Sequence, residues 1–109
     1  MSQSTADTPI YSAFADEDDL DELIALFVDE IPLRIESLLE AAHDADWEGV
    51  RRLAHQLKGA GGSYGFQEVT EVAARLERTC QKPEDPETLK SALEEMVQTC
   101  RRMRSGSTG

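Results

Sequence analysis

The sequence predicts an all-α protein, folded as an antiparallel up-down four-helix bundle. Apolar residues recur at spacings of three and four in four separate segments, with no convincing strand alternation between them. The connections between consecutive segments are short, which makes neighbouring helices antiparallel. A chain of 109 residues fits one domain and is long enough to bury a core.

The first long helix is predicted from an apolar stripe along one face. Its members are Leu20, Leu23, Ile24, Phe27, Ile31, Ile35, Leu38, Leu39 and Ala42. Asp18 is expected to cap the N-terminus, because its side-chain oxygens can accept hydrogen bonds from the free N–H groups of the first turn. Pro32 lies inside the stripe and lacks a backbone donor, so a kink or a brief break is expected there.

The remaining helices have recognisable ends. The second is predicted over about residues 47–64, and Gly65 suits the left-handed position that follows a helix. The third carries the apolar residues from Phe66 to Cys80, and the turn after it is placed at residues 82–84. Asp85 and Pro86 open the fourth helix, as its N-cap and its first helical residue.

The bundle is expected to span residues 10–104. The flanking segments, residues 1–9 and 105–109, are polar and are predicted to be disordered tails. Ile10, Tyr11 and Phe14 can pack a short N-terminal segment onto the bundle, in a shape that the sequence does not define. The initial Met1 and the short tails favour a freestanding protein over one domain of a larger hybrid kinase.

The charge excludes several classes of function. The chain has 22 acidic and 11 basic residues, a net charge of -11, which argues against binding nucleic acids or anionic membranes. No apolar run approaches the roughly 20 residues of a membrane span, and the polar N-terminus does not resemble a signal peptide. Two cysteines suit a reducing compartment, so we expect a cytoplasmic protein. We also expect a monomer. Two His and two Cys without ligand spacing argue against a metal site.

The second helix carries the candidate chemistry. On a helical wheel Leu53, Leu57, Ala60 and Tyr64 form the core face, and His55 points directly away from it. Three cations and two glycines lie within about 60° of His55 around the axis: Arg51, Arg52, Lys58, Gly59 and Gly62. Exposed helical glycines cost about 1 kcal/mol each, which suggests that a partner approaches the backbone closely. Cations beside a nucleophilic imidazole suit a covalently held phosphoryl group.

A longer motif surrounds this histidine. The run His55-Gln56-Leu57-Lys58-Gly59-Ala60-Gly61-Gly62-Ser63-Tyr64-Gly65-Phe66 resembles the signature of histidine-containing phosphotransfer (HPt) domains of bacterial two-component phosphorelays. The upstream segments at residues 27–32 and 46–47 are also similar to that family. The resemblance covers about residues 20–103, nearly the whole chain.

The resemblance implies a phosphorelay carrier. His55 would accept a phosphoryl group from an aspartyl phosphate on a response-regulator receiver domain and pass it to another receiver; a hybrid histidine kinase is a further partner. Such domains need no cofactor and have no ATP site, since Mg²⁺ and the reactive Asp belong to the receiver. Lys58 and Ser63 would stabilise the phosphoryl group. Four residues would form the docking surface: Gly59, Gly62, Arg51 and Arg52.

Several alternatives stay open. The chain could be a non-catalytic helical adaptor that binds a receiver without phosphotransfer, although His55 with Lys58 argues against it. Arg51 and Arg52 could simply belong to a solvated face, and Gly61 is expected to serve helix packing. The glycine cluster does not match a nucleotide-binding loop, because it follows a helix and has the wrong spacing. The sequence identifies neither the cognate kinase and regulator, nor the direction of phosphoryl flow, nor a phosphatase role.

Overall fold

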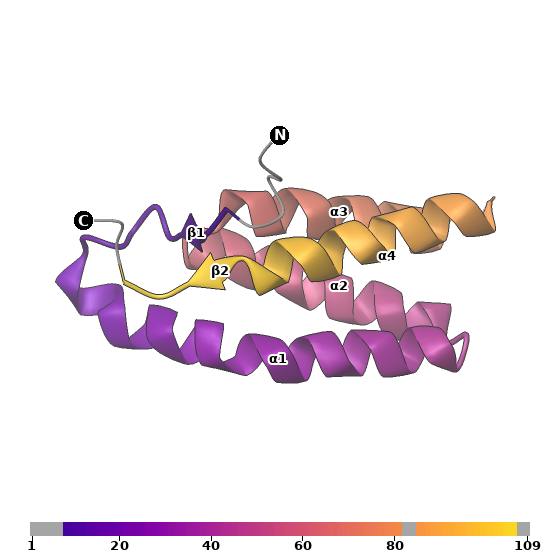
Figure 1. The fold of residues 1–109 in the computed structure, drawn as a ribbon, viewed down its shortest axis with the longest axis horizontal. Helices are drawn as coiled ribbons and strands as arrows, with labels where there is room; N and C mark the ends of the chain where they lie inside the picture. Colours follow the sequence, from indigo (N-terminus) through magenta and orange to yellow (C-terminus); the bar gives the residue numbers. More distant parts are fainter. Residues whose placement is uncertain (1–7, 82–84, 107–109) are drawn as a thin grey trace.

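Four helices form an antiparallel bundle in the computed structural model, which describes residues 8–81 and 85–106 (Figure 1). Their bounds are α1 Asp21–His43, α2 Trp47–Ser63, α3 Gln67–Gln81 and α4 Pro86–Arg101. Each helix packs against the next along the chain, and α1 also contacts α4. The predicted up-down four-helix bundle is therefore confirmed. The turn predicted at residues 82–84 lies outside the described residues.

Helix α1 differs from its prediction at two positions. Asp18 opens a short 3-10 turn, Asp18–Leu20, and the residue before α1 is Leu20, so the prediction that Asp18 caps this helix was wrong. The helix then continues through Pro32, so of the two predicted alternatives, a kink or a brief break, the break does not occur. Pro32 is exposed, so its ring meets no core side chain and the helix loses only one backbone hydrogen bond.

The core is built from one face of each helix. From α1 it takes a stripe narrower than predicted, because Leu23 and Leu39 at its edges are 46% and 41% exposed. The buried members on this helix are Ile24, Phe27, Ile31, Ile35 and Leu38. The Phe27 ring lies 5.0 Å from Tyr64 and 6.0 Å from Phe66, so α1 is joined to the corner between α2 and α3.

Local hydrogen bonds and backbone conformation fix the ends of α2 and α4, and the predicted roles of Asp85, Pro86 and Gly65 are among them. The Asp46 side chain accepts a hydrogen bond from the Gly49 amide at 3.0 Å, and Asp85 accepts one from the Glu87 amide at 3.1 Å. Pro86 occupies the first turn of α4. Gly65 has a φ of +82°, the left-handed conformation expected after α2.

An N-terminal segment closes one end of the bundle. Strand β1, Ile10–Tyr11, pairs in parallel with strand β2, Met103–Arg104, after α4 (Figure 1). The buried Ser12 hydroxyl donates to the Tyr64 carbonyl and accepts from the Phe14 amide. Strands of two residues show no alternation, so the sequence did not predict them. This pairing gives the predicted N-terminal segment its shape.

Two further predictions concern the ends of the chain and a membrane-spanning helix. Residues 1–7 and 107–109 lie outside the described residues, so the division into tails and a domain over 10–104 stays a prediction. Within the described part of the chain, no helix combines the length and apolar character needed to cross a membrane.

Candidate functional site

The orientation of α2 determines which residues reach the surface. Its buried residues are Gly49, Val50, Ala54, Leu57 and Gly61, whereas Leu53, Ala60 and Tyr64 are only half-buried. The core face is thus rotated by about 50° from the predicted one. His55 consequently lies about 130° from the centre of the core face, not directly opposite it, and is tilted toward α3.

His55 meets an acidic side chain from the neighbouring helix. The imidazole is 62% exposed, and its Nδ1 atom lies 2.9 Å from Oε2 of Glu77 on α3. The Glu77 side chain is only 11% exposed. A carboxylate accepts hydrogen bonds, so this contact favours the tautomer in which Nδ1 carries the proton. The other ring nitrogen, Nε2, makes no hydrogen bond with any described residue and is left as the basic, nucleophilic atom.

Two cations share the same carboxylate. Lys58 Nζ lies 2.7 Å from Glu77 Oε1, and Arg51 Nη1 lies 3.9 Å from Oε2. The hydrogen bond from Lys58 is the main cause that lowers the pKa of Glu77, and the bond to His55 adds to it against the effect of burial. Glu77 is therefore ionised at neutral pH. Arg51 also pairs with Glu48, which lowers the pKa of that carboxyl.

The glycines predicted near His55 differ in what surrounds them. A Cβ atom added at Gly59 would meet nothing within 4 Å, and one at Gly62 would only touch the Thr70 hydroxyl at 3.7 Å. A Cβ at Gly61 would lie 2.9 Å from that hydroxyl and 3.2 Å from the Thr70 amide nitrogen. Gly61 therefore serves the packing of α2 on α3, as predicted, whereas Gly59 and Gly62 leave open surface beside the histidine.

The remaining predicted residues are not brought to the imidazole. Arg52 is exposed and makes no ion pair with a described residue. Ser63 is exposed at the end of α2, eight positions after His55, which corresponds to about 12 Å along the helix axis. That separation keeps its hydroxyl beyond hydrogen-bond reach of a group on His55. No cluster of three potential metal ligands occurs among residues 8–81 and 85–106.

Sequence reasoning missed Glu77. One signal was available, because Glu77 lies one turn after Ala73 and one turn before Cys80, within the apolar stripe of α3. A carboxylate on a buried face requires partners. The sequence could not show that those partners are His55 and Lys58, since that depends on how α2 and α3 are rotated against each other.

The arrangement has a definite chemical capacity. An exposed imidazole presents one free nitrogen, and its second nitrogen is oriented by a carboxylate, which is the geometry of an activated nucleophile. A lysine ammonium 2.7 Å from the same carboxylate supplies positive charge beside it. These groups can receive and hold a small anionic electrophile such as a phosphoryl group.

The comparisons with known proteins agree with this chemistry. The family model of the Hpt domain matches residues 22–104, which include all four helices apart from the first residue of α1. No curated protein and no solved structure matches the chain significantly. Hpt domains are phosphocarrier modules that interact with the receivers and kinases of two-component systems. The chain therefore belongs to the Hpt domain family, and its role lies in phosphotransfer within two-component signalling.

Proposed function

We propose that the protein is a phosphorelay intermediate in which Nε2 of His55 carries the phosphoryl group. The group arrives from the aspartyl phosphate of one receiver domain and leaves to the aspartate of another. The observation that carries this proposal is the 2.9 Å contact between His55 Nδ1 and Glu77, which leaves Nε2 as the free nitrogen of an exposed ring.

Phosphoryl transfer from the receiver to His55 needs no reactant besides the two proteins. The lone pair of Nε2 attacks phosphorus, the bond between phosphorus and the aspartyl oxygen breaks, and the receiver recovers its carboxylate. The proton on Nδ1 stays in place, so the ring acquires positive charge as the N–P bond forms. Glu77 faces that proton and stabilises the charge, which is a contribution made mainly in the transition state and the product.

Lys58 supports the incoming group. An ammonium has three N–H donors, so Lys58 can keep one hydrogen bond to Glu77 and offer another to a phosphoryl oxygen. The partly exposed Nζ atom, on a side chain 36% exposed, can make this adjustment without disturbing the core. Mg²⁺ and the reactive aspartate would be contributed by the receiver, so the chain needs no cofactor of its own.

The open surface around His55 is the proposed docking site for the receiver. Gly59 and Gly62 have no side chains to hold the receiver away, and a Cβ atom would fit at both positions without a clash. The fold therefore does not require glycine at either position. Arg51 and Arg52 flank the same face and can contact an acidic receiver surface.

The direct test is labelling by a phosphorylated receiver in the presence of Mg²⁺. We expect an acid-labile, alkali-stable label on the wild-type protein and none on His55→Gln, whose fold should persist because the ring is exposed. A label of equal strength on the variant would show that another residue is the acceptor.

Two further arms separate this proposal from its rivals. A receiver that binds the wild-type protein but never labels it would indicate a non-catalytic adaptor. Incubation with ATP and Mg²⁺ alone should give no label, because we propose a carrier without its own kinase activity. Efficient self-labelling would contradict the carrier role.

A further inference from the structure

The edge of the bundle between α1 and α4 contains an open groove unrelated to His55. It has a volume of about 440 Å³, within the roughly 300–1,000 Å³ range of small-molecule sites. Its lining comes only from α1, the end of α4 and β2, whereas His55 and Glu77 meet between α2 and α3. The groove is thus a separate surface of the molecule.

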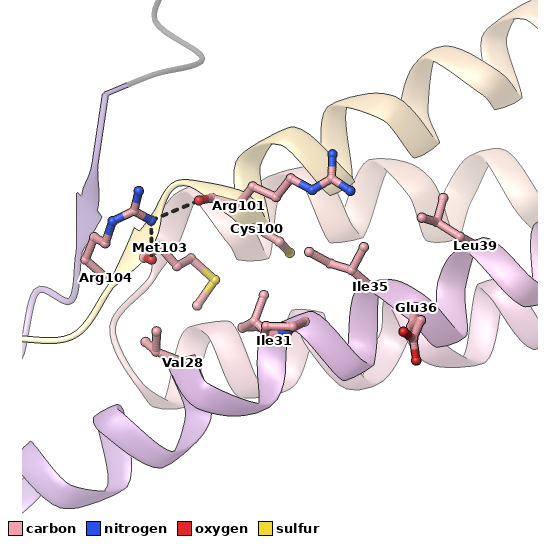
Figure 2. Close-up of a pocket in the computed structure, with 10 residues that line it drawn as sticks. Val28, Ile31, Ile35, Glu36, Leu39, Cys100, Arg101, Met103 and Arg104 are labelled. Atoms are coloured by element: carbon pink, nitrogen blue, oxygen red, sulfur yellow. Dashed lines mark hydrogen bonds between the residues drawn. The ribbon is translucent and has the colours of Figure 1, made fainter.

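The floor of the groove is apolar. Ile31 and Ile35 of α1 face Cys100 and Met103 across it, and all four are buried in the described structure (Figure 2). The apolar residues Val28 and Leu39 lie toward its two ends, eleven positions apart, or about 16 Å along α1. This length suits one extended alkyl chain lying between the two helices.

The α4 side of the groove carries positive charge. Arg104 donates from Nη1 to the carbonyl oxygens of Arg101 and Met103, at 2.9 and 2.8 Å, and these bonds hold its guanidinium at the rim (Figure 2). Carbonyl partners do not neutralise a guanidinium. Glu36 also lines the groove, but its carboxylate points away from the apolar floor (Figure 2).

Arg101 also lines the groove, and neither Arg101 nor Arg104 has an acidic partner among the described residues. Four other arginines do pair with a glutamate: Arg34, Arg51, Arg75 and Arg102. In a chain with 22 acidic and 11 basic residues, two arginines against one glutamate give the lining of this groove the opposite net charge from the chain as a whole. A guanidinium offers a planar set of donors that matches a carboxylate.

We propose that this groove binds a free single-chain amphiphile with a carboxylate head. The alkyl chain would lie along Ile31, Ile35 and Met103, and the carboxylate would meet Arg104 beside Met103. The guanidinium of Arg101 points toward the other end of the groove and adds positive charge along the same side (Figure 2). A chain presented by an anionic membrane is disfavoured, because the net charge of -11 repels such a surface. A second copy of the protein in the groove is disfavoured for the same reason.

The test uses sodium octanoate as the probe, below its micelle concentration, with the ¹⁵N-labelled full chain observed by NMR. 1-Octanol and octyltrimethylammonium have the same chain length with a neutral and a cationic head. We expect octanoate to shift the amide signals of Ile31, Ile35, Cys100 and Met103, and to bind more tightly than either analogue.

Matched variants test each half of the groove. Arg101→Gln combined with Arg104→Gln should weaken octanoate binding about three- to tenfold and leave octanol binding unchanged, as expected for rim charges. Arg78→Gln, an exposed arginine of α3 without an ion pair to a described residue, should change neither. Leu39→Gln should weaken both ligands, whereas Leu33→Gln on the same helix, 67% exposed and outside the groove, should weaken neither.

Several outcomes would overturn the proposal. These are equal affinity for octanoate and octanol, signal shifts confined to residues outside the groove, and an effect of Arg78→Gln as large as that of the double variant. If the double variant fails to fold, the three-ligand comparison on the wild-type protein and the leucine pair still decide. If octanoate leaves the groove untouched but a receiver domain shifts its signals, the groove is a protein interface and the proposal is wrong.

Discussion

At the scale of single residues, Glu77 links the histidine to the rest of the fold. Its carboxylate contacts His55, Lys58 and, at a longer distance, Arg51, so one buried acid holds three basic side chains of α2 together. The same contacts that orient the imidazole also stabilise the packing of α2 on α3. Changing Glu77 should therefore affect both phosphotransfer and folding.

We predict that Glu77→Gln slows phosphoryl transfer to His55 and lowers the free energy of unfolding at neutral pH by about 1–3 kcal/mol. The pKa of Glu77 is lowered from its ordinary 4.5, chiefly by Lys58, so the folded protein holds fewer protons there than the unfolded chain. Its stabilising effect is complete above pH 4.5 and is lost as the pH falls through the lowered value.

Denaturant unfolding of both proteins at neutral pH and below pH 4.5 measures this effect. The difference in unfolding free energy should narrow in acid. Glu94→Gln on α4, at an exposed position, is the matched control and should show no such pH dependence. A difference that stays constant with pH would mean that Glu77 is not ionised in the folded protein.

Lys58 makes a separate prediction about rate. Lys58→Ala should slow transfer about tenfold, equivalent to about 1.4 kcal/mol in the barrier, because it removes positive charge beside the moving phosphoryl group. Stability should change less than with Glu77→Gln, since the lysine is partly solvated. The check is single-turnover transfer from one phosphorylated receiver, with Lys90→Ala as an exposed control on α4. Equal rates for Lys58→Ala and wild type would remove this lysine from the site.

At the scale of elements, helices with local end signals were predictable and contacts between elements were not. Asp85 and Gly65 act within a few residues of themselves, so their roles could be recognised in the sequence. The prediction at Asp18 failed because residues Asp18–Leu20 form a 3-10 turn, which leads into α1 with Leu20 at the capping position and no side-chain cap.

Substituting the glycines of α2 should change the melting temperature in opposite directions. Gly59→Ala and Gly62→Gln should raise the melting temperature, because both gain helix propensity worth up to about 1 kcal/mol and neither meets a clash. Gly61→Ala should lower it, because its Cβ would lie 2.9–3.3 Å from Thr70 and the Phe66 carbonyl. Thermal unfolding of the three variants checks this order.

Transfer rates on the same variants then test docking. Gly62→Gln places a long side chain on the proposed receiver surface, so transfer should fall sharply although the protein is more stable. A stable variant with a normal transfer rate would place the receiver elsewhere. A destabilised Gly62→Gln would mean that this glycine, like Gly61, serves helix packing.

At the scale of the whole molecule, what the sequence could not supply is the set of contacts between distant segments. The pairing of β1 with β2, and the bond from Arg102 Nε to the Thr8 carbonyl at 2.8 Å, join residues about ninety positions apart. The contact of His55 with Glu77 crosses between two helices in the same way. The class of fold follows from the periodicity of apolar residues. The position of Glu77 beside His55, and the groove between α1 and α4, depend instead on how each helix is rotated about its axis.

The two buried cysteines give the last prediction, which concerns alkaline stability. Both are free, and burial raises the pKa of the Cys80 thiol from 9.0 to about 11 and that of Cys100 to about 12. The folded protein thus keeps protons that the unfolded chain loses above pH 9.0, so this stabilising contribution is complete below pH 9.0 and declines as the pH rises toward the folded values.

Between neutral pH and about pH 10, the wild-type protein should therefore lose roughly 1–3 kcal/mol of unfolding free energy through these thiols. A Cys80→Ala and Cys100→Ala double variant starts less stable because of its small cavities, but its deficit should shrink by that amount at the higher pH. Val97→Ala removes comparable volume from the buried face of α4 without a titrating group, so its deficit should stay constant. Denaturant unfolding of the three proteins at both pH values decides. An equal loss of unfolding free energy in all three proteins would show that ionisation of the thiols does not cause the loss of stability at high pH.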